Sequence, residues 1–215
     1  MKKIVLLPMD ERPCNYKFPK RLFENEEIQI IEPEQLGFKK DGADYQAIKE
    51  FLCKECKDAY GLIISMDMLL YGGLIPSRIH HQDEESLVKK LEIIKELRKE
   101  NPNLKIFAFQ CIMRCPSYSS SDEEPDYYEE YGKQIHDLGE AVNMHQVGIS
   151  QGQRISELTK EIPEEYIEDF ISRREINRQM NMNVIDLLQE GYLDSLIIPQ
   201  DDSTTYGYPA MDQKV

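Results

Sequence analysis

Five short apolar runs recur along the chain, and each is followed by a polar loop or a segment with helical spacing. The runs are rich in leucine and β-branched residues and span only a few residues each, which is typical of buried strands. They cover Lys3–Pro8, Ile28–Ile31, Gly61–Met66, Leu104–Ile112 and Leu193–Pro199. Because the runs are continuously apolar rather than alternating, they indicate strands of a parallel sheet that is covered on both faces.

Helical patterns lie between these runs. Glu84–Glu100 carries Leu87, Leu91, Ile94 and Leu97 at steps of three and four, and Asn101-Pro102 follows it as a stop signal. The other helix-like segments are Ala43–Tyr60, Asp126–Gln146 and Pro163–Gln189. The pattern predicts an α/β fold of alternating β/α units around a mainly parallel sheet, either Rossmann-like or part of a barrel-like sheet.

The chain length favours one domain over residues 1–215, because chains of this size commonly form a single core. Five predicted strands are too few for an eight-stranded barrel, and no helix follows the last one. We therefore expect the chain to be an incomplete unit, the amino-terminal portion of a longer protein or half of a barrel-like sheet.

Composition narrows the classes of partner. Hydrophobic residues make up 40% of the chain, enough for a core, and the formal net charge is −14. Such a charge repels nucleic acid and anionic membranes, so neither is expected as a partner. The apolar runs are far shorter than the ~20 residues of a membrane span. Lys2-Lys3 before an apolar run is similar to a signal peptide, but the run ends at Pro8, so we predict a cytoplasmic protein.

The five cysteines fit a reducing compartment, because their number is odd. The pairs Cys53/Cys56 and Cys111/Cys115 allow a zinc interpretation. The first pair, however, lies in a helix-like segment, where cysteine is commonly a small buried apolar residue. We favour structural thiols and keep zinc as the alternative.

Polar side chains gather after the predicted strands, where the carboxyl ends of parallel strands meet at one edge of a sheet and ligands bind. Asp10, Glu11, Arg12 and Asn15 follow the first strand. Asp67, Tyr71, Gly72, Gly73 and Arg78 follow the third. Gln110 and Arg114 follow the fourth, and Gln200, Asp201, Asp202 and Tyr206 follow the fifth. This shared position predicts a carboxylate-rich site.

Each cluster also has a purely structural interpretation. Asp10 and Arg12 suit a local ion pair in a solvated loop, and Gly72-Gly73 suits a turn that requires positive φ. Asp201 and Asp202 suit the N-cap of a following helix. The tight pair His80-His81 is best interpreted as an exposed loop, since neighbouring residues rarely bind one ion together.

The residue types at this edge favour acid–base chemistry on a sugar. Of two adjacent carboxyl groups, one can be held protonated, so Asp201 and Asp202 would supply a general acid and a charge stabiliser. Asp67 would bind hydroxyl groups, while Arg12, Asn15 and Arg78 would orient the substrate. Stacking on a sugar face is the role expected of Tyr71, Tyr206 and Tyr208.

A divalent metal is the close alternative. Asp10, Asp67 and Asp201 are hard oxygen ligands from three strand ends, which suits Mg²⁺ or Mn²⁺. The sequence has no phosphate loop of the Gly-x-x-x-x-Gly-Lys type, no dinucleotide-binding Gly-x-Gly-x-x-Gly and no Gly-x-Ser-x-Gly nucleophile motif.

Four motifs together resemble a bacterial family known as domain of unknown function 4127. They are Leu-Pro-Met-Asp-Glu-Arg-Pro-Cys-Asn at 7–15, Asp67-x-x-x-Tyr71-Gly72-Gly73 continuing to Arg78, Arg174-x-x-Asn177, and Gln200-Asp201-Asp202-x-x-x-Tyr206-Gly207. The resemblance adds Arg174 and Asn177 to the substrate-binding candidates. It implies members about twice this length, with this chain as their amino-terminal part, and it implies no established activity.

We therefore expect a hydrolase that acts on a carbohydrate or sugar derivative, with a small molecule as its partner. The alternatives are a metal-dependent hydrolase, a non-catalytic ligand-binding module, and a half-domain that self-associates through an unpaired sheet edge.

Overall fold

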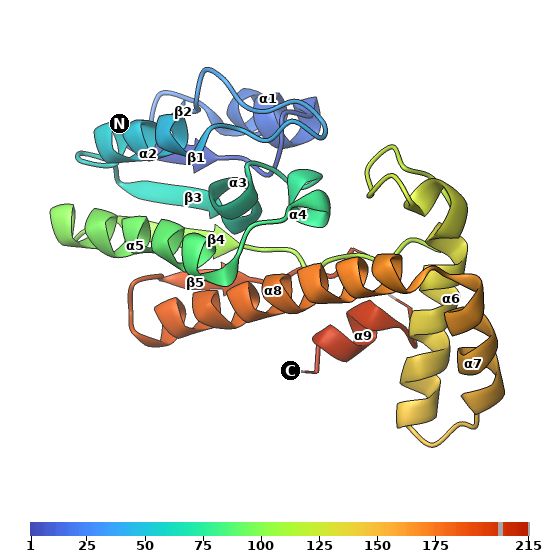
Figure 1. Cartoon of the computed structure of the whole chain (residues 1–215). Helices are drawn as coiled ribbons and strands as arrows, with labels where there is room; N and C mark the ends of the chain where they lie inside the picture. The colour runs from blue at the N-terminus through green and yellow to red at the C-terminus, as the bar shows by residue number, and fades with distance from the viewer. Residues whose placement is uncertain (202–203, 215) are drawn as a thin grey trace. The chain divides into compact units, whose positions relative to one another are not determined.

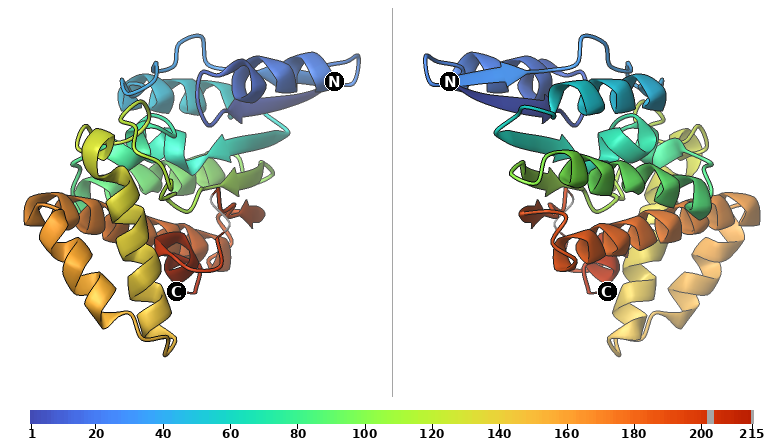
Figure 2. Two further views of the ribbon diagram at one scale, coloured as in Figure 1. Left: turned by 90° about the vertical axis from the view of Figure 1, so that its right-hand side faces the viewer. Right: turned by 90° about the vertical axis from the view of Figure 1, so that its left-hand side faces the viewer.

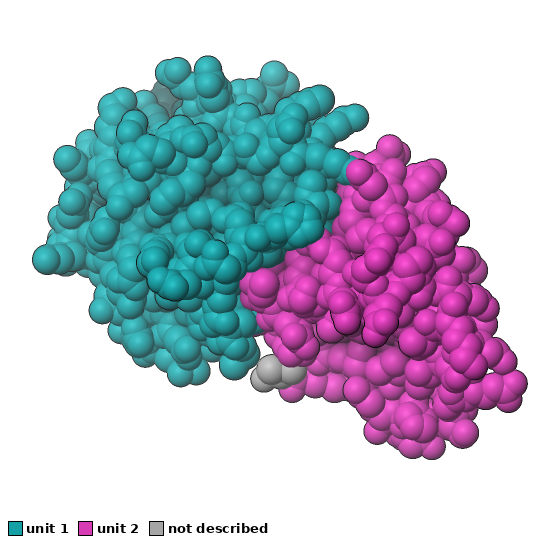
Figure 3. All heavy atoms as spheres, viewed as in Figure 1, with its two compact units in different colours: residues 1–110, 179–198 teal, residues 111–178, 199–215 magenta. Residues whose placement is uncertain are grey.

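The computed structural model describes residues 1–201 and 204–214. These residues form two compact units, shown in different colours in Figure 3. Unit 1 comprises residues 1–110 and 179–198, and unit 2 comprises residues 111–178 and 199–215. Each unit is described by itself below, and the expectation of one domain over residues 1–215 stays a prediction.

Unit 1 contains a five-stranded, all-parallel sheet in the order β2-β1-β3-β4-β5. Its strands are β1 (Lys2–Leu7), β2 (Ile28–Ile31), β3 (Gly61–Ser65), β4 (Lys105–Phe109) and β5 (Ser195–Ile197). The α/β class with a parallel sheet is confirmed. The sheet is open, with β2 and β5 at its edges, so the described residues form a Rossmann-like rather than a barrel-like arrangement.

The two faces of this sheet are unequally buried. In β3, Leu62 and Ile64 are fully buried, whereas Ile63 between them is 39% exposed. Side chains of a strand alternate between faces, and paired positions share a face. Leu7, Ile64 and Ala108 are paired across β1, β3 and β4 and define the buried face. Unit 1 therefore packs its core against one side of the sheet.

Three long helices accompany that core: α2 (Tyr45–Glu55), α5 (Glu84–Glu100) and the part of α8 (Glu164–Gln189) that belongs to unit 1. Helix α8 runs beside α5 in Figures 1 and 2. The helices begin where side chains cap them, since Asp44 accepts a hydrogen bond from the Ala47 N–H and Asp83 from the Ser86 N–H. Their apolar stripes, including Ile48, Leu52, Leu87 and Ile94, are buried.

Helix α1 (Pro13–Phe23) differs from these helices, because all of its side chains are partly or fully exposed. It connects β1 to β2, and the strand order shows why it stands apart. The step from β1 to β2 runs in one direction across the sheet, whereas the next three steps run in the other. Right-handed crossovers then place α1 on the face opposite to α2, α5 and α8.

Unit 2 is helical, with α6 (Tyr128–Gln146), α7 (Gly152–Glu161), the first part of α8 and α9 (Tyr208–Asp212). Its core is an apolar cluster that includes Tyr128, Ile135, Leu158, Phe170 and Tyr208. Gly139 leaves room for the Tyr208 ring, because a Cβ there would lie 2.3 Å from a ring carbon. Among the described residues, no helix combines the length and apolarity that crossing a membrane requires.

Candidate functional site

The sheet of unit 1 reverses its winding at β1, which pairs with β2 on one side and β3 on the other. In open parallel sheets this reversal opens a crevice at the carboxyl ends of the strands, and ligands bind there. Leu7 pairs with Ile64, so Asp10 and Asp67, each three residues further on, follow neighbouring strand ends. Asp10 is 4% exposed and Asp67 is 2% exposed. Two buried carboxyl groups therefore mark the switch point.

Asp10 is held by its own loop. Its Oδ1 accepts hydrogen bonds from the Arg12 N–H at 3.0 Å and from Asn15 Nδ2 at 2.7 Å. Its Oδ2 accepts from Arg12 Nε at 2.7 Å and lies 2.5 Å from Arg12 Nη2. Glu11 fixes the other side of the loop by accepting from the Lys39 N–H at 2.9 Å. The predicted local ion pair is confirmed, and it gives Asp10 a positioning rather than a reactive geometry.

Asp67 lies in the short helix α3 (Met66–Tyr71), directly after β3. Ser65 caps this helix by accepting a hydrogen bond from the Met68 N–H at 3.2 Å. The helix turns the chain away from the sheet within two residues of the strand end, and it is buried along its whole length. This turn explains how a polar carboxyl group becomes enclosed at the edge of a parallel sheet.

Gly72 and Gly73 end α3 with φ values of +86° and +145°. A Cβ on Gly72 would lie 2.6 Å from the Ala43 nitrogen and 2.8 Å from the Ala43 oxygen. The Ala43 N–H donates to the Gly72 carbonyl at 2.9 Å, which requires this approach of the two backbones. The turn interpretation of these glycines is confirmed, and their role in substrate binding stays a prediction.

Tyr71 is 5% exposed and stacks on His80 with ring centroids 4.6 Å apart. Burial, with the charge of Asp67 as a second cause, raises the pKa of the Tyr71 hydroxyl well above its ordinary value. Arg78 is 2% exposed in helix α4 (Pro76–Ile79). The exposed-loop interpretation is wrong for His80, which is buried against Tyr71, although His81 is exposed.

Burial adds further polar groups near the strand ends, of which Gln110 was already expected at this edge. Ser65, Ser77 and Gln110 are all buried polar residues of unit 1 at the carboxyl ends of its strands or in the segments that follow. Gln110 Oε1 and the Tyr71 hydroxyl oxygen have no hydrogen-bond partner among the described residues. Such atoms are rare in folded proteins and commonly mark functional positions. Their position after a strand was the available sequence signal.

In unit 2, Arg114 lies within ion-pair distance of three of the described acidic side chains. Its Nε donates to Glu124 Oε1 at 2.7 Å, Nη2 lies 3.1 Å from Glu123 Oε2, and Nη1 lies 3.9 Å from Asp201 Oδ2. The first two of these carboxylates share a small cavity of about 180 Å³ with Arg114, Tyr118 and Ser120. The Asp201 side chain is 51% exposed, and Asp202 lies outside the described residues. These contacts link Arg114 to the segment that follows Cys115.

Arg174, introduced by the family resemblance, is buried within unit 2. Its Nε pairs with Asp212 Oδ2 at 2.7 Å, Nη1 donates to the Arg114 carbonyl at 3.2 Å and Nη2 donates to the Met113 carbonyl. Burial raises the pKa of Asp212 even though Arg174 and Arg178 lower it. Asn177 contacts Met113 Sδ at 3.6 Å. Both motif residues thus support the segment that leads to Arg114.

Tyr206 in the last motif and Tyr208 directly after it have different surroundings. Tyr208 is 6% exposed and packs at 5.6 Å against Phe170, so the prediction that it stacks on a ligand is wrong. Tyr206 is partly exposed, and its carbonyl accepts from the Thr204 hydroxyl at 2.7 Å. Gln200 forms a parallel bridge with Ile112. Gly207 occupies the N-cap position of α9, so Asp201 does not cap this helix, and the same prediction for Asp202 lies outside the described residues.

The zinc and divalent-metal alternatives depend on clusters of ligand side chains. The described residues contain no group of three or more His, Cys, Asp or Glu side chains that could hold a metal ion. None of the five cysteines, all of which lie in the described part of the chain, forms a disulfide, and burial raises the pKa of Cys56 to about 12. A thiol with such a pKa is a structural group.

The candidate residues therefore form two sets. Unit 1 holds Asp10, Glu11, Arg12, Asn15, Asp67, Tyr71, Gly72, Gly73 and Arg78, and unit 2 holds Arg174, Asn177, Gln200, Asp201 and Tyr206. Within unit 1 the topology brings the first and second motifs to the ends of the neighbouring strands β1 and β3. That both sets act on one substrate stays a prediction.

Neither a curated protein nor a solved structure gives a significant match to the chain. One family model matches residues 4–215, and its description is "Protein of unknown function (DUF4127)". The match covers all four motifs described above. The chain therefore belongs to this family.

Proposed function

We propose that the protein is a hydrolase of a carbohydrate or sugar derivative, with its site at the carboxyl edge of the parallel sheet. The observation that carries the proposal is the pair of buried carboxyl groups at the switch point, Asp10 and Asp67. A buried carboxyl group is costly unless hydrogen bonds or function retain it. Asp10 is bound by Arg12 and by Asn15 of α1, so we assign it a positioning role. We assign the binding role to Asp67 because it lies buried at the end of the neighbouring strand β3.

In this proposal the residues have separate roles in binding and catalysis. Asp67 binds substrate hydroxyl groups, and Arg12, Asn15 and Arg78 orient the substrate. Asp201 and Asp202 act as general acid and charge stabiliser. The half-exposed Asp201 carboxylate beside Arg114 is consistent with a group that substrate reaches.

Kinetics on aspartate variants test this division. Hydrolysis of a panel of chromogenic glycosides is measured for the wild type and for Asp67→Asn, Asp201→Asn and Asp202→Asn. General acid catalysis contributes about 10²–10⁴-fold, so kcat falls by that factor in one of the last two variants. Asp67→Asn raises KM more than it lowers kcat.

Asp58→Asn is the matched control, because Asp58 precedes β3 at the amino edge of the sheet and pairs with Lys3 at 2.7 Å. It leaves turnover unchanged. If no glycoside is hydrolysed, or if Asp201→Asn and Asp202→Asn both keep wild-type turnover, the proposal is wrong. Melting temperature with added Mn²⁺ or Mg²⁺ addresses the metal alternative, since a bound ion raises it by mass action.

A further inference from the structure

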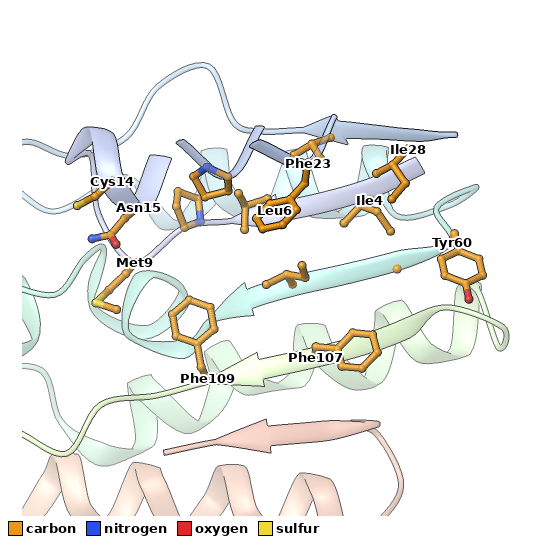
Figure 4. A pocket seen from close by; sticks show the side chains of 15 residues that line it. Ile4, Leu6, Met9, Cys14, Asn15, Phe23, Ile28, Tyr60, Phe107 and Phe109 are labelled. Carbon is orange, nitrogen blue, oxygen red and sulfur yellow. The ribbon is translucent and has the colours of Figure 1, made fainter. Parts of the chain in front are cut away.

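The face of the sheet opposite to α2 and α5 carries an apolar groove, here called the open-face groove. It has a volume of about 440 Å³. Its floor consists of Ile4 and Leu6 from β1, Ile63 from β3, and Phe107 and Phe109 from β4 (Figure 4). Ile63 is 39% and Phe107 46% exposed. Buried parallel sheets are covered on both faces, so this exposure is unusual.

The dimensions of the uncovered strip fit one helix. Helix α1 contacts β2, which leaves the strip over β3 and β4 and towards β5. Neighbouring strands lie about 4.8 Å apart, so this strip is about 10 Å wide, the diameter of an α-helix. The five residues of β3 extend about 17 Å, the length of a helix of about 11 residues.

Helix α1 forms a wall with an apolar flank. Cys14, Phe18 and Leu22 are spaced four residues apart and form one stripe beside the groove-lining residues Pro19 and Phe23. Phe18 is 45% and Leu22 73% exposed. Wall and floor together therefore present an apolar corner of the kind against which a second helix packs.

The border of this corner is basic, although the chain has a net charge of −14. Arg21 follows Phe18 by three residues on α1, so it lies next to the apolar stripe. Lys2 Nζ lies 4.2 Å from the ring centroid of Tyr60, which lines the groove. Lys105 shares the face of Phe107 by strand alternation and also pairs with Asp194 at 3.4 Å. A negatively charged flank complements this border, and a positively charged flank is repelled.

We propose that the open-face groove binds an amphipathic α-helix of a partner protein, about 11 residues or longer, with an apolar face and acidic flanks. The apolar face packs on Ile63, Phe107 and the α1 stripe. The acidic flank lies beside Lys2 and Arg21. This is the helix-in-groove mode of recognition, in which apolar anchors give affinity and flanking charges give specificity.

Two synthetic helical peptides test the proposal. Both carry the same leucine face, and one has glutamate while the other has lysine at the flanking positions. Fluorescence anisotropy measures their binding to the whole 215-residue chain. The glutamate peptide binds at least about tenfold more tightly than the lysine peptide, as expected for a basic border. Phe107→Glu weakens binding of the glutamate peptide at least about tenfold, and Lys2→Glu with Arg21→Glu reverses the preference between the peptides.

Phe38→Glu is the matched control, because Phe38 is 65% exposed and does not line the groove. It leaves binding unchanged. If Phe107→Glu lowers the melting temperature, Ile63→Gln provides the same test with a smaller change. No binding of the glutamate peptide, equal binding of both peptides, or binding that survives Phe107→Glu overturns the proposal. A dimer in sedimentation that Phe107→Glu dissociates assigns the groove to a second copy and likewise overturns it.

Discussion

The two faces of the parallel sheet are built from the same kinds of residues but have opposite surroundings. Leu62, Ile64 and Ile106 are fully buried on the face of α2 and α5, whereas Ile63 and Phe107, one position away on the same strands, are exposed. Apolar content therefore does not decide burial here. The direction of each crossover decides it, because three of the four crossovers share one face.

The largest expected effect on stability comes from removing apolar volume on the buried face, compared with the same change on the open face. Ile64→Ala creates a cavity at a fully buried position and destabilises the protein by about 2–5 kcal/mol. Ile63→Ala, at its 39% exposed neighbour, costs less than about 1.5 kcal/mol. Urea denaturation of both variants gives the difference, and equal losses would contradict the contrast between the faces.

Backbone packing on the covered side is tested at Gly72. Gly72→Ala forces a left-handed φ and a Cβ that lies 2.6 Å from a backbone nitrogen, so it costs about 3 kcal/mol. Gly191→Ala is the matched control, because φ is +82° there and nothing lies within 4 Å of the added Cβ. Its cost of about 1–2 kcal/mol measures the conformational part alone. Thermal melts compare the two variants.

The hydrogen bonds of Asp194 in unit 1 have a smaller, pH-dependent effect on the free energy of unfolding. Asp194 accepts hydrogen bonds from Arg98 Nη2 at 2.6 Å and the Ile106 N–H at 2.8 Å. Burial raises the pKa of Asp194, but these bonds outweigh it and hold the pKa below its ordinary value of 3.8. The stability from this carboxylate is therefore present above pH 3.8 and is lost as the pH falls through the lower folded pKa.

Asp194→Asn consequently destabilises the protein at pH 7 by about 1–3 kcal/mol and flattens the acid limb of its stability curve. Denaturation between neutral and acid pH measures both effects. A variant as acid-sensitive as the wild type would show that other carboxylates control that limb.

The smallest expected effect lies on the open face. Phe107→Ser changes the free energy of unfolding by less than about 1 kcal/mol, because the ring is 46% exposed. The same change lowers the fluorescence of a bound hydrophobic dye, since it removes part of the groove floor. Ile106→Ser, on the buried face, produces the opposite pattern of large destabilisation.

Sequence patterns predicted the elements whose signals are local. Glu84–Glu100 was predicted with both ends correct, because Asp83 caps its start and Asn101-Pro102 ends it. Helix α1 was not predicted, since Pro19 interrupts it and it has no buried stripe. The fourth run was predicted to extend to Ile112, but the strand ends at Phe109, and the apolar residues beyond it are buried in unit 2.

Among the candidate site residues, too, only contacts between residues close in the sequence could be predicted. The Asp10–Arg12 pair was predictable because its partners are two residues apart. The bonds from Arg114 to Glu123 and Glu124 were not, because they depend on how the loop after Cys115 returns to Arg114. Tyr208 was predicted to stack on a ligand because it is a tyrosine. It is a core residue instead, because Gly139 has no side chain and leaves room for the Tyr208 ring.

The placement of unit 2 between β4 and β5 has a consequence for synthesis. Phe107 of β4 pairs with Ser195 of β5, so the last strand leaves the ribosome only after residues 111–194 have been made. During that interval the β4 edge lacks its neighbour and exposes unpaired backbone groups. Released chains truncated before residue 195 should therefore be more dependent on chaperones than chains that include residues 195–198.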